Sequence, residues 1–233
     1  MKCDFHIHTS FSSDSSLSPK RLVEICLEKQ IDCICVTDHN EIKGALQTLH
    51  FAFDKPLLVI CGMEVKTERG DILLLNLKKK IKNFSSFEEL IKKARKEKAF
   101  VVLPHPFAFP IAFRNPKEVV EKGLIDAIEV ENASSYSLAN KMAKKLCQKF
   151  DFPFTAGSDA HHEIMVGKAY LEIEGENLKK EEIFERIKKR KAKIKKEKIS
   201  LFERGIEYSN RVFAKIRHFF EKESISFLPR PKV

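Results

Sequence analysis

Short apolar runs alternate with amphipathic stretches over roughly the first 170 residues of the chain. The apolar runs have the length of strands, and the stretches between them carry apolar residues at helical spacing. One such helix is predicted from Pro19 to about Lys29, because Ser18 is a good N-cap residue and proline suits the first helical position. Alternating units of this kind predict a parallel sheet covered by helices.

Strand-like runs recur as far as Leu171. They are the N-terminal run through Phe5, the runs at residues 31–36, 57–65, 71–77, 99–103, 126–130 and 152–156, and the one through Ala169. Further helices are expected at residues 41–51, 88–98, 116–122 and 138–150. The spacing alone leaves a seven-stranded barrel, an eight-stranded barrel and an open sheet as alternatives.

From Glu174 onward the pattern changes to that of long helices. Ile183, Phe184 and Ile187 form one apolar stripe. A second stripe steps by three and four through Phe202, Ile206, Ser209, Phe213, Ile216 and Phe220. We therefore expect a barrel domain at residues 1–174 and a helical extension at 175–233 that packs on its outside. The Pro229-Arg230-Pro231 segment is expected to be frayed.

Composition places this chain of 233 residues among soluble globular proteins, with 43% hydrophobic and 33% charged residues. No apolar run approaches the ~20 residues of a membrane span, and Met1 leads directly into the first strand, so we expect a cytoplasmic protein without membrane contact. The net charge is +10, and the segment 179–198 holds eleven Lys or Arg against four Glu. The six cysteines show no C-x-x-C spacing, which argues against a zinc knuckle or a disulfide framework.

Histidines and acidic residues follow the predicted strands. His6 and His8 lie on one face of the first strand, because strand side chains alternate, and two imidazoles can bind one metal ion. Two surface histidines near a terminus are the alternative reading of that pair alone. Similar clusters end four later strands: Thr37-Asp38-His39, Gly62-Met63-Glu64, Pro104-His105-Pro106 and Gly157-Ser158-Asp159-Ala160-His161. In parallel α/β folds the reactive groups gather at the carboxyl ends of the strands, so a clustered metal site is predicted there.

These motifs, together with Asp14, resemble the PHP (polymerase and histidinol phosphatase) superfamily and occur in that family's order. The resemblance covers roughly the first 170 residues. It implies an α/β fold, a distorted seven-stranded (β/α)7 TIM-like barrel, to which this chain would add its basic C-terminal helical appendage. It also implies hydrolysis of phosphoesters at a site that holds two to three divalent metal ions.

The resemblance assigns a ligand set to each ion. His6, His8, Glu64 and Asp159 would hold the first, Glu64, Asp71 and His105 the second, and Asp14, His39 and His161 the third. A bridging Glu64 is physically reasonable, because a shared carboxylate offsets the repulsion between neighbouring cations. Many relatives have histidine in place of Asp71, which is also a common turn residue after Gly70. Asp14 has helix capping as its alternative role.

The implied chemistry uses the metal cluster and a cation from the protein. Mixed histidine and carboxylate ligands suit zinc, manganese or iron, and such ions lower the pKa of a bound water. Glu64, Asp159 and His161 are the predicted catalytic residues of the cluster. Arg114, on the loop after His105, is the predicted phosphate clamp, with a surface salt bridge as its alternative role. Lys66, Arg69 and Asn132 are further candidates for substrate binding.

The leading hypothesis is a metal-dependent phosphoesterase that acts on a small phosphorylated metabolite or a nucleotide. One alternative is an exonuclease acting on DNA or RNA ends, with the basic C-terminal helix contacting nucleic acid. Another is a nucleic-acid-binding or regulatory module with a vestigial metal site. The near-complete ligand set argues against this last alternative.

Overall fold

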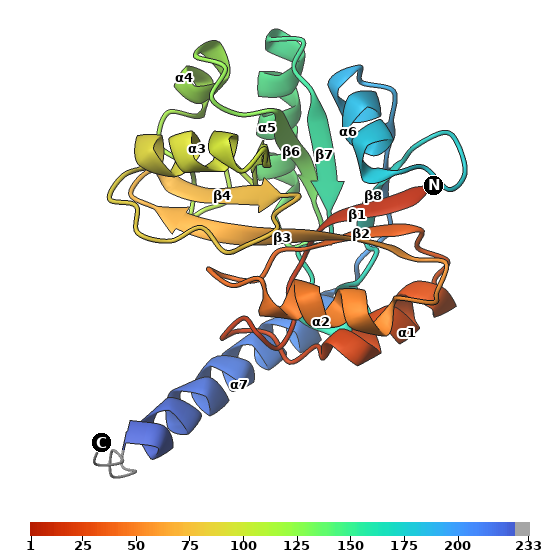
Figure 1. The fold of residues 1–233 in the computed structure, drawn as a ribbon, viewed down its shortest axis with the longest axis vertical. Coiled ribbons are helices and arrows are strands. Elements are labelled where there is room, and N and C mark those ends of the chain that lie inside the picture. The colour runs from red at the N-terminus through yellow and green to blue at the C-terminus, as the bar shows by residue number, and fades with distance from the viewer. Residues whose placement is uncertain (227–233) are drawn as a thin grey trace.

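The computed structural model describes the backbone of residues 1–226 and the side chains of residues 1–220. The predicted frayed segment Pro229-Arg230-Pro231 lies outside these described residues. One mixed sheet is surrounded by helices (Figure 1). Its strands are β1 (Lys2–Ile7), β2 (Cys33–Val36), β3 (Leu58–Thr67), β4 (Gly70–Leu75), β5 (Phe100–Leu103), β6 (Ala127–Asn132), β7 (Phe154–Gly157), β8 (Ala169–Glu172) and β9 (Lys193–Lys196).

The helices connect these strands in the order that the sequence predicts up to β7. They are α1 (Pro19–Glu28), α2 (Lys43–Phe51), α3 (Phe87–Lys96), α4 (Pro116–Glu121), α5 (Ser137–Lys149), α6 (Lys180–Lys188) and α7 (Leu201–Ser226). The side chain of Ser18 accepts a hydrogen bond from the backbone N–H of Arg21, which confirms the predicted cap of α1.

The strand order is β7-β6-β5-β4-β3-β2-β1-β8-β9. Strands β1 to β3 are parallel to one another, and so are β5 to β7, whereas β4 runs antiparallel to both of its neighbours. The β3–β4 turn requires Gly70, whose φ of +131° is a conformation that residues with a side chain rarely adopt. The six strands of the two parallel sets therefore end at the same edge of the sheet.

The sheet curls until its two ends meet. The start of β1 pairs with β8, while residues after β7 bond to the end of β1. The N–H of Asp159 donates to the carbonyl oxygen of His6 at 2.7 Å, and the N–H of His8 donates to that of Ala160 at 2.9 Å. The result is an α/β barrel-like fold that is nearly closed.

The expected count of seven strands is wrong, because the described residues form nine. Strand β8 is the run through Ala169, and it forms an antiparallel pair with β9 beside β1. Strand β9 lies in the segment for which only helices were expected. Its sequence is Lys-Ile-Lys-Lys, and Ile194 is its single apolar residue. Such a charged strand is typical of a sheet edge, and its composition gives almost no strand signal.

Helix α6 buries the apolar stripe that was predicted for it, since Ile183, Phe184 and Ile187 join a core cluster with residues of β1 and β2. The stripe on α7 behaves differently, because Phe202, Phe213 and other members face solvent. The expected boundary near residue 174 stays a prediction.

All six cysteines are free and buried. Among the described residues, no helix is both long enough and apolar enough to span a membrane.

Candidate metal centre

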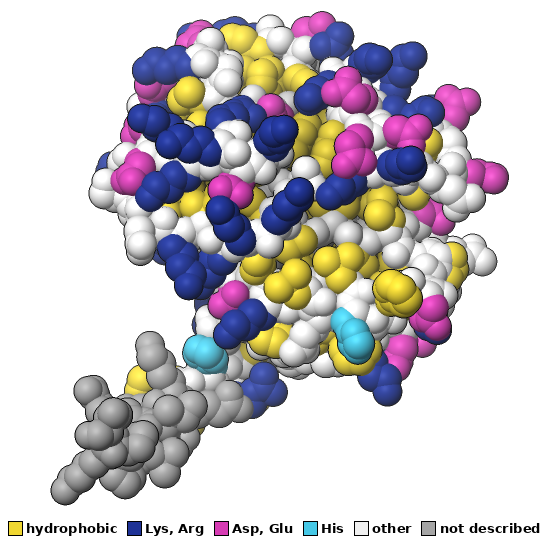
Figure 2. Space-filling view, in the orientation of Figure 1, with side chains coloured by type: hydrophobic (Ala, Val, Ile, Leu, Met, Phe, Trp, Pro, Cys, Tyr) yellow, Lys and Arg dark blue, Asp and Glu magenta, His cyan; other side chains and the backbone are white. Residues whose placement is uncertain are grey.

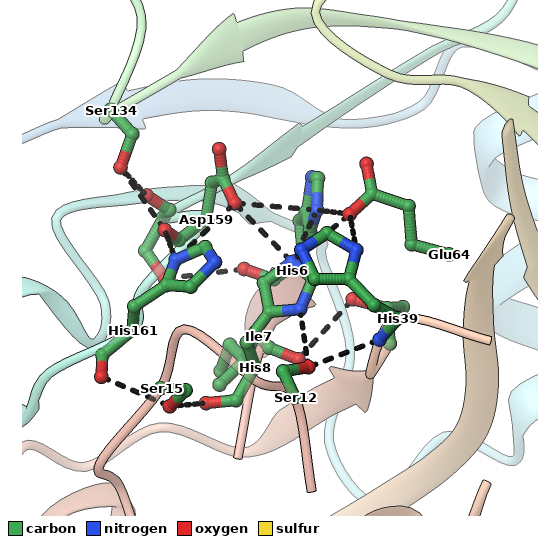
Figure 3. Close-up of polar contacts among 12 residues, drawn as sticks. His6, Ile7, His8, Ser12, Ser15, His39, Glu64, Ser134, Asp159 and His161 are labelled. Carbon is green, nitrogen blue, oxygen red and sulfur yellow. Dashed lines mark hydrogen bonds and ion pairs between the residues drawn. The ribbon is translucent and has the colours of Figure 1, made fainter. Parts of the chain in front are cut away.

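The predicted ligands converge at the end of the barrel where the parallel strands finish (Figure 3). Three groups of side chains place their ligand atoms within 4.8 Å of one another: His6, His8 and Asp159; His6, Glu64 and His105; and His8, His39 and His161. Asp14 adjoins the third group, because its Oδ1 lies 3.4 Å from Nε2 of both His39 and His161. The sequence motifs therefore form one continuous cluster.

The hydrogen bonds of His6 and His8 leave two nitrogen lone pairs facing each other. Nδ1 of His6 lies 3.1 Å from the carboxylate of Glu129, which can only accept. Nδ1 of His8 lies 3.1 Å from Oγ of Ser12, whose single hydrogen is donated to Asp38. Both Nδ1 atoms must therefore donate, so in the neutral rings both Nε2 atoms carry lone pairs, only 3.1 Å apart. Such a contact requires a cation or a proton.

His161 and Asp14 also present acceptor lone pairs to each other. Nδ1 of His161 lies 2.9 Å from the carbonyl oxygen of Asp159, so this nitrogen donates and the lone pair lies on Nε2. That Nε2 and Oδ1 of Asp14 are both buried without a hydrogen-bond partner. Buried polar atoms are almost always partnered, and these two are both acceptors aimed at the same space. The residues present therefore fit a divalent metal ion.

Glu64 occupies the centre of the cluster. Its Oε2 lies 3.5 Å from Nε2 of His6, 3.2 Å from Nε2 of His8 and 3.1 Å from Nδ1 of His39. Its Oε1 lies 3.1 Å from Nε2 of His105. Burial by itself would raise the pKa of Glu64, but the imidazoles of His6 and His39 outweigh burial and hold the pKa well below its usual value. Glu64 thus lies against four imidazoles of the cluster, those of His6, His8, His39 and His105.

The electrostatics of the cluster are those of a cation site. Burial opposes charge on His39, yet the carboxylates of Glu64 and Asp14 raise its pKa to about 10. Burial, together with the imidazoles of His161 and His39, lowers the pKa of His8 and favours its neutral form. Burial would raise the pKa of Asp159, but His6 and His8 lower it overall. Protons and metal ions compete for such groups, so the ligands become deprotonated when metal binds.

Two ligand-bearing residues adopt backbone conformations that side chains disfavour. His105 has φ +27° and Asp159 has φ +52°. A close approach adds a further constraint, because a Cβ on Gly157 would lie 2.4 Å from Cβ of His6. Backbone strain of this kind persists where surrounding contacts enforce it, and it often occurs at functional sites. These backbone conformations direct the side chains of His105 and Asp159, which follow β5 and β7, toward the cluster.

Of two further predicted site residues, Asn132 contacts the cluster and Asp71 lies outside its ligand groups. Asp71 belongs to none of the three ligand groups, although Glu64 is near enough to contribute to the raised pKa that burial gives Asp71. Asn132 is buried in the site, and its Nδ2 donates to Glu129 at 2.9 Å and to Asp159 at 3.3 Å. Asn132 is therefore brought to the cluster, as expected.

The three cationic residues predicted to bind substrate have their described contacts outside the cluster. The guanidinium of Arg69 pairs with Glu88 and Glu118. Arg114 is exposed, and its recorded contacts with Arg69 are made by its backbone. Lys66 is exposed near the end of β3. None of the three side chains is in contact with a cluster ligand among the described residues, so their predicted role in substrate binding stays a prediction.

Sequence reasoning missed Glu129, which is 1% exposed. It contacts His6, accepts from the backbone N–H of His105 at 2.9 Å, and accepts from Asn132. A signal was present, because an acidic residue inside the apolar run Ala127–Val130 is costly to bury unless it is fully paired.

Helix α7 was also missed as part of the site. Glu207 accepts from the backbone N–H of His161 at 2.9 Å, and Arg211 and Lys215 both approach Asp14. No motif marks these residues, since they lie at ordinary helical spacing in a charge-rich segment. Only the return of α7 to the carboxyl ends of the strands brings them to the cluster.

The fold and the site together define an α/β barrel-like protein with a histidine and carboxylate cluster at the strand ends. A family model described as PHP-associated (PHP_C) matches residues 137–192. An uncharacterized protein of Methanocaldococcus jannaschii, MJ1587, is 31% identical over 166 residues, which cover 64% of this chain and 95% of that protein. A second from the same organism, MJ0417, is 35% identical over 188 residues, covering 77% of this chain and 73% of that protein.

Solved structures share the fold at low identity. PsfC from Pseudomonas syringae has a TM-score of 0.67 at 18% identity and covers 93% of this chain and 98% of its own. A Bifidobacterium adolescentis protein described as a candidate metal-dependent phosphoesterase has a TM-score of 0.59 at 14% identity, covering 78% and 94%. An amidohydrolase from Chromobacterium violaceum, solved with sulfate and without metal, has a TM-score of 0.59 at 13% identity, covering 70% and 88%. The chain belongs to the PHP domain family.

Proposed function

We propose that the protein is a metal-dependent hydrolase that cleaves phosphoester bonds of a small phosphorylated metabolite or nucleotide. One observation carries this proposal: lone pairs on His6, His8 and His161 face one another and face carboxylates, in a buried space whose polar atoms are acceptors. Metal cations satisfy such a set of ligands, and protons take their place when no metal is bound. The name of the Bifidobacterium adolescentis structure, which mentions a metal-dependent phosphoesterase, agrees with the proposal.

In this proposal the cluster holds two to three divalent ions. His6, His8 and Asp159 would hold one, Glu64 and His105 a second, and Asp14, His39 and His161 a third, with Glu64 shared. Zinc, manganese and iron suit these ligands. Divalent ions bound there supply Lewis-acid stabilisation of phosphoryl charge and an acidified water. Asp71 joins this scheme only if its side chain turns toward His105.

Residues behind the ligands fix their orientation. The carboxylate of Glu129 holds Nδ1–H of His6, and the hydroxyl of Ser12 holds Nδ1–H of His8, so both Nε2 atoms face the cluster. Asn132 donates to Asp159 and restrains that carboxylate. Such partners raise the basicity of a histidine ligand and set its tautomer. The backbone and side chains around the cluster also exclude bulk water from its buried side.

The position of the basic segment 179–198 favours the phosphoesterase over the nuclease alternative. Arg190, two residues after the end of α6, pairs with Asp151 just before β7 begins, whereas the candidate ligand Asp159 follows the end of β7. The α6 part of the basic segment is therefore at the opposite end of the strands from the cluster. Figure 2 shows Lys and Arg side chains interspersed with acidic ones on the visible face.

A reconstitution screen tests the proposed function. The full chain, loaded with manganese or zinc, is offered an aryl phosphate monoester, an aryl phosphodiester, nucleotides and a labelled oligonucleotide. Hydrolysis of the small phosphoesters that is lost in Glu64→Gln is the expected result, because glutamine keeps the shape but loses the shared charge. Activity of Glu64→Gln within about tenfold of the parent would show that the charge of Glu64 is not needed. Turnover of the oligonucleotide alone would favour the nuclease.

A further inference from the structure

Helix α7 turns a charged face, and not its apolar face, toward the barrel. Glu207 and Ala214 are buried against the body, while Phe202, Phe213 and Phe219 are more than half exposed. Figure 1 shows α7 passing beneath the barrel and then extending away from it. Burying charged groups is costly unless they are paired, so this orientation requires partners for the charges that face inward. For Glu207, Arg211 and Lys215 the partners are His161 and Asp14 of the cluster.

Glu207 anchors the helix beside His161. Its Oε1 accepts from the backbone N–H of His161 at 2.9 Å and lies 3.6 Å from Nδ1 of the same residue. The whole residue is 5% exposed, and its other oxygen, Oε2, is buried without a hydrogen-bond partner. This contact fixes the rotation of α7, so that the residues one and two turns further along point at the same edge of the cluster.

Those residues are Arg211 and Lys215, which follow Glu207 at intervals of four. An Nη of Arg211 lies 3.5 Å and Nζ of Lys215 lies 3.6 Å from the same oxygen, Oδ2 of Asp14. The other oxygen of Asp14 faces the imidazoles of His39 and His161 at 3.4 Å. Asp14 therefore separates the imidazoles from two cations of the helix.

The two cations connect the buried cluster with solvent. The side chain of Arg211 is 31% exposed and that of Lys215 is 60% exposed, whereas Asp14 is 5% exposed. Both contacts with Asp14 are too long for good hydrogen bonds, so most donors of the guanidinium and the ammonium remain available. When Asp14 serves a divalent ion, its charge is shared with that ion, and Arg211 and Lys215 are then free to bind another anion.

We propose that Arg211 and Lys215 form the phosphate clamp of this site and select phosphomonoesters over phosphodiesters. The proposal deepens the proposed function and rests on it for the substrate class. A guanidinium binds phosphate oxygens in pairs, and a lysine one turn away adds a second positive charge. A monoester carries a charge of about −1.5 to −2 at neutral pH, which two cations match, whereas a diester carries one negative charge. This clamp is formed by residues of α7, whereas the sequence predicted Arg114 for the same role.

The test compares the manganese-loaded parent chain with Arg211→Gln, Lys215→Gln, the double variant and Arg211→Lys. The matched control is Lys92→Gln with Lys96→Gln, which removes two exposed lysines at the same spacing on α3. Three quantities are measured: bound metal, the affinity for inorganic phosphate by calorimetry, and KM and kcat for an aryl monoester and an aryl diester. Circular dichroism and metal content show whether each variant folds and loads.

We expect the double variant to keep its metal and lose phosphate affinity by about ten- to hundredfold, since hydrogen bonds between charged groups are strong. KM for the monoester should rise by a similar factor, with a much smaller change for the diester. Arg211→Lys should recover part of the loss, and the α3 control should match the parent. If the double variant fails to fold, the single change at the more exposed Lys215 must still weaken phosphate binding.

Three results would contradict the clamp. The first is a parent that binds no phosphate, and the second is a double variant that binds phosphate as tightly as the parent. The third is a rise in KM that is equal for the monoester and the diester. The failure of each proposal is distinguishable. If the parent hydrolyses the monoester and the double variant does so equally well, the clamp is wrong and the proposed function stands. If the parent binds phosphate through Arg211 and Lys215 but hydrolyses nothing, the clamp stands and the proposed function is wrong.

Discussion

Glu129 holds His6 in the orientation that the metal-binding cluster requires, with Oε1 at 3.1 Å from Nδ1 and both side chains fully enclosed. Its second oxygen accepts from the backbone N–H of His105 and from Asn132. Both oxygens of Glu129 are thus acceptors, and both serve residues of the site. A single change at this position tests whether the residues behind the ligands matter for metal binding.

Glu129→Gln should weaken metal binding by about 10- to 100-fold, the usual effect of losing a partner of a metal-bound histidine. Glutamine has one acceptor oxygen where Glu129 uses two, so one of its present donors would face an NH2 group. The measurement is competition with a chromophoric chelator, and the exposed Glu176→Gln is the control. Unchanged affinity in Glu129→Gln would mean that His6 does not depend on this carboxylate.

Removal of metal should lower the thermal stability of the protein. We expect two to three divalent ions per chain, because eight cluster residues offer ligand atoms. A ligand at about 100 times its Kd stabilises the folded state by about 2.7 kcal/mol, and a chain of this size gains roughly 2–4 °C per kcal/mol, so chelation should lower Tm by roughly 5–10 °C. Calorimetry before and after chelation, with metal analysis, measures this. Fewer than one ion per chain after dialysis against manganese or zinc would contradict it.

The sequence was sufficient to bring most of the candidate ligands together, because nearly all of them follow a strand end within a local motif. His6 and His8 share a strand face, and Asp159 and His161 follow an apolar run, so alternation and the parallel arrangement bring them together. Asp71 shows the limit of this reasoning. It is the second residue of β4, which runs antiparallel to its neighbours, so the rule that reactive groups gather at the carboxyl ends of parallel strands does not place it.

The sequence was insufficient where position depends on long-range packing. The four residues of β9 carry three lysines, and they form a strand only because β8 offers an unpaired edge. The apolar stripe of α7 predicted packing of that stripe on the barrel, but the contact is made by Glu207 and Arg211 on the opposite face. Helical periodicity identifies an apolar face without showing which face a neighbour covers.

Glu131 ties β9 to the rest of the fold and should make stability depend on pH. Its side chain is 4% exposed and pairs with Lys144 of α5 and with Lys196 of β9, the latter at 2.5 Å. Burial raises the pKa of Glu131, but the two lysines outweigh burial and lower it below the ordinary 4.5. A lowered folded-state pKa stabilises the protein above pH 4.5, and this contribution is lost as the pH falls through the lowered value.

Glu131→Gln should therefore cost about 1–3 kcal/mol of unfolding free energy at neutral pH, the range for hydrogen bonds to charged groups, with a smaller cost near about pH 3. Denaturant titrations at both pH values measure the difference. The control is Glu172→Gln, which breaks the half-exposed pair with Lys195 between β8 and β9 and should cost less than about 0.5 kcal/mol. An equal cost of Glu131→Gln at both pH values would show that its charge is not what stabilises β9.

The basic segment 179–198 should bind nucleic acid only weakly. Lys188 pairs with Glu185, and Arg190 pairs with Asp151, so part of its charge is already neutralised. We expect the parent to bind duplex DNA only in the non-specific range, with a Kd of roughly 10⁻⁴ to 10⁻⁶ M at physiological salt. Each phosphate contact contributes a slope of about −0.9 to the log–log dependence of affinity on salt, because counterions are released.

The variant Lys188→Gln, Lys189→Gln, Arg190→Gln and Lys191→Gln should flatten that slope if these side chains make the contacts. Fluorescence anisotropy with a labelled duplex at several salt concentrations measures both affinity and slope. A weak parent with a shallow slope is the expected result, because α6 lies at the opposite end of the strands from the metal-binding cluster. Nanomolar affinity that the variant loses would reverse the ranking and make a nuclease the leading function, since tight backbone binding would then have to deliver a strand to the cluster.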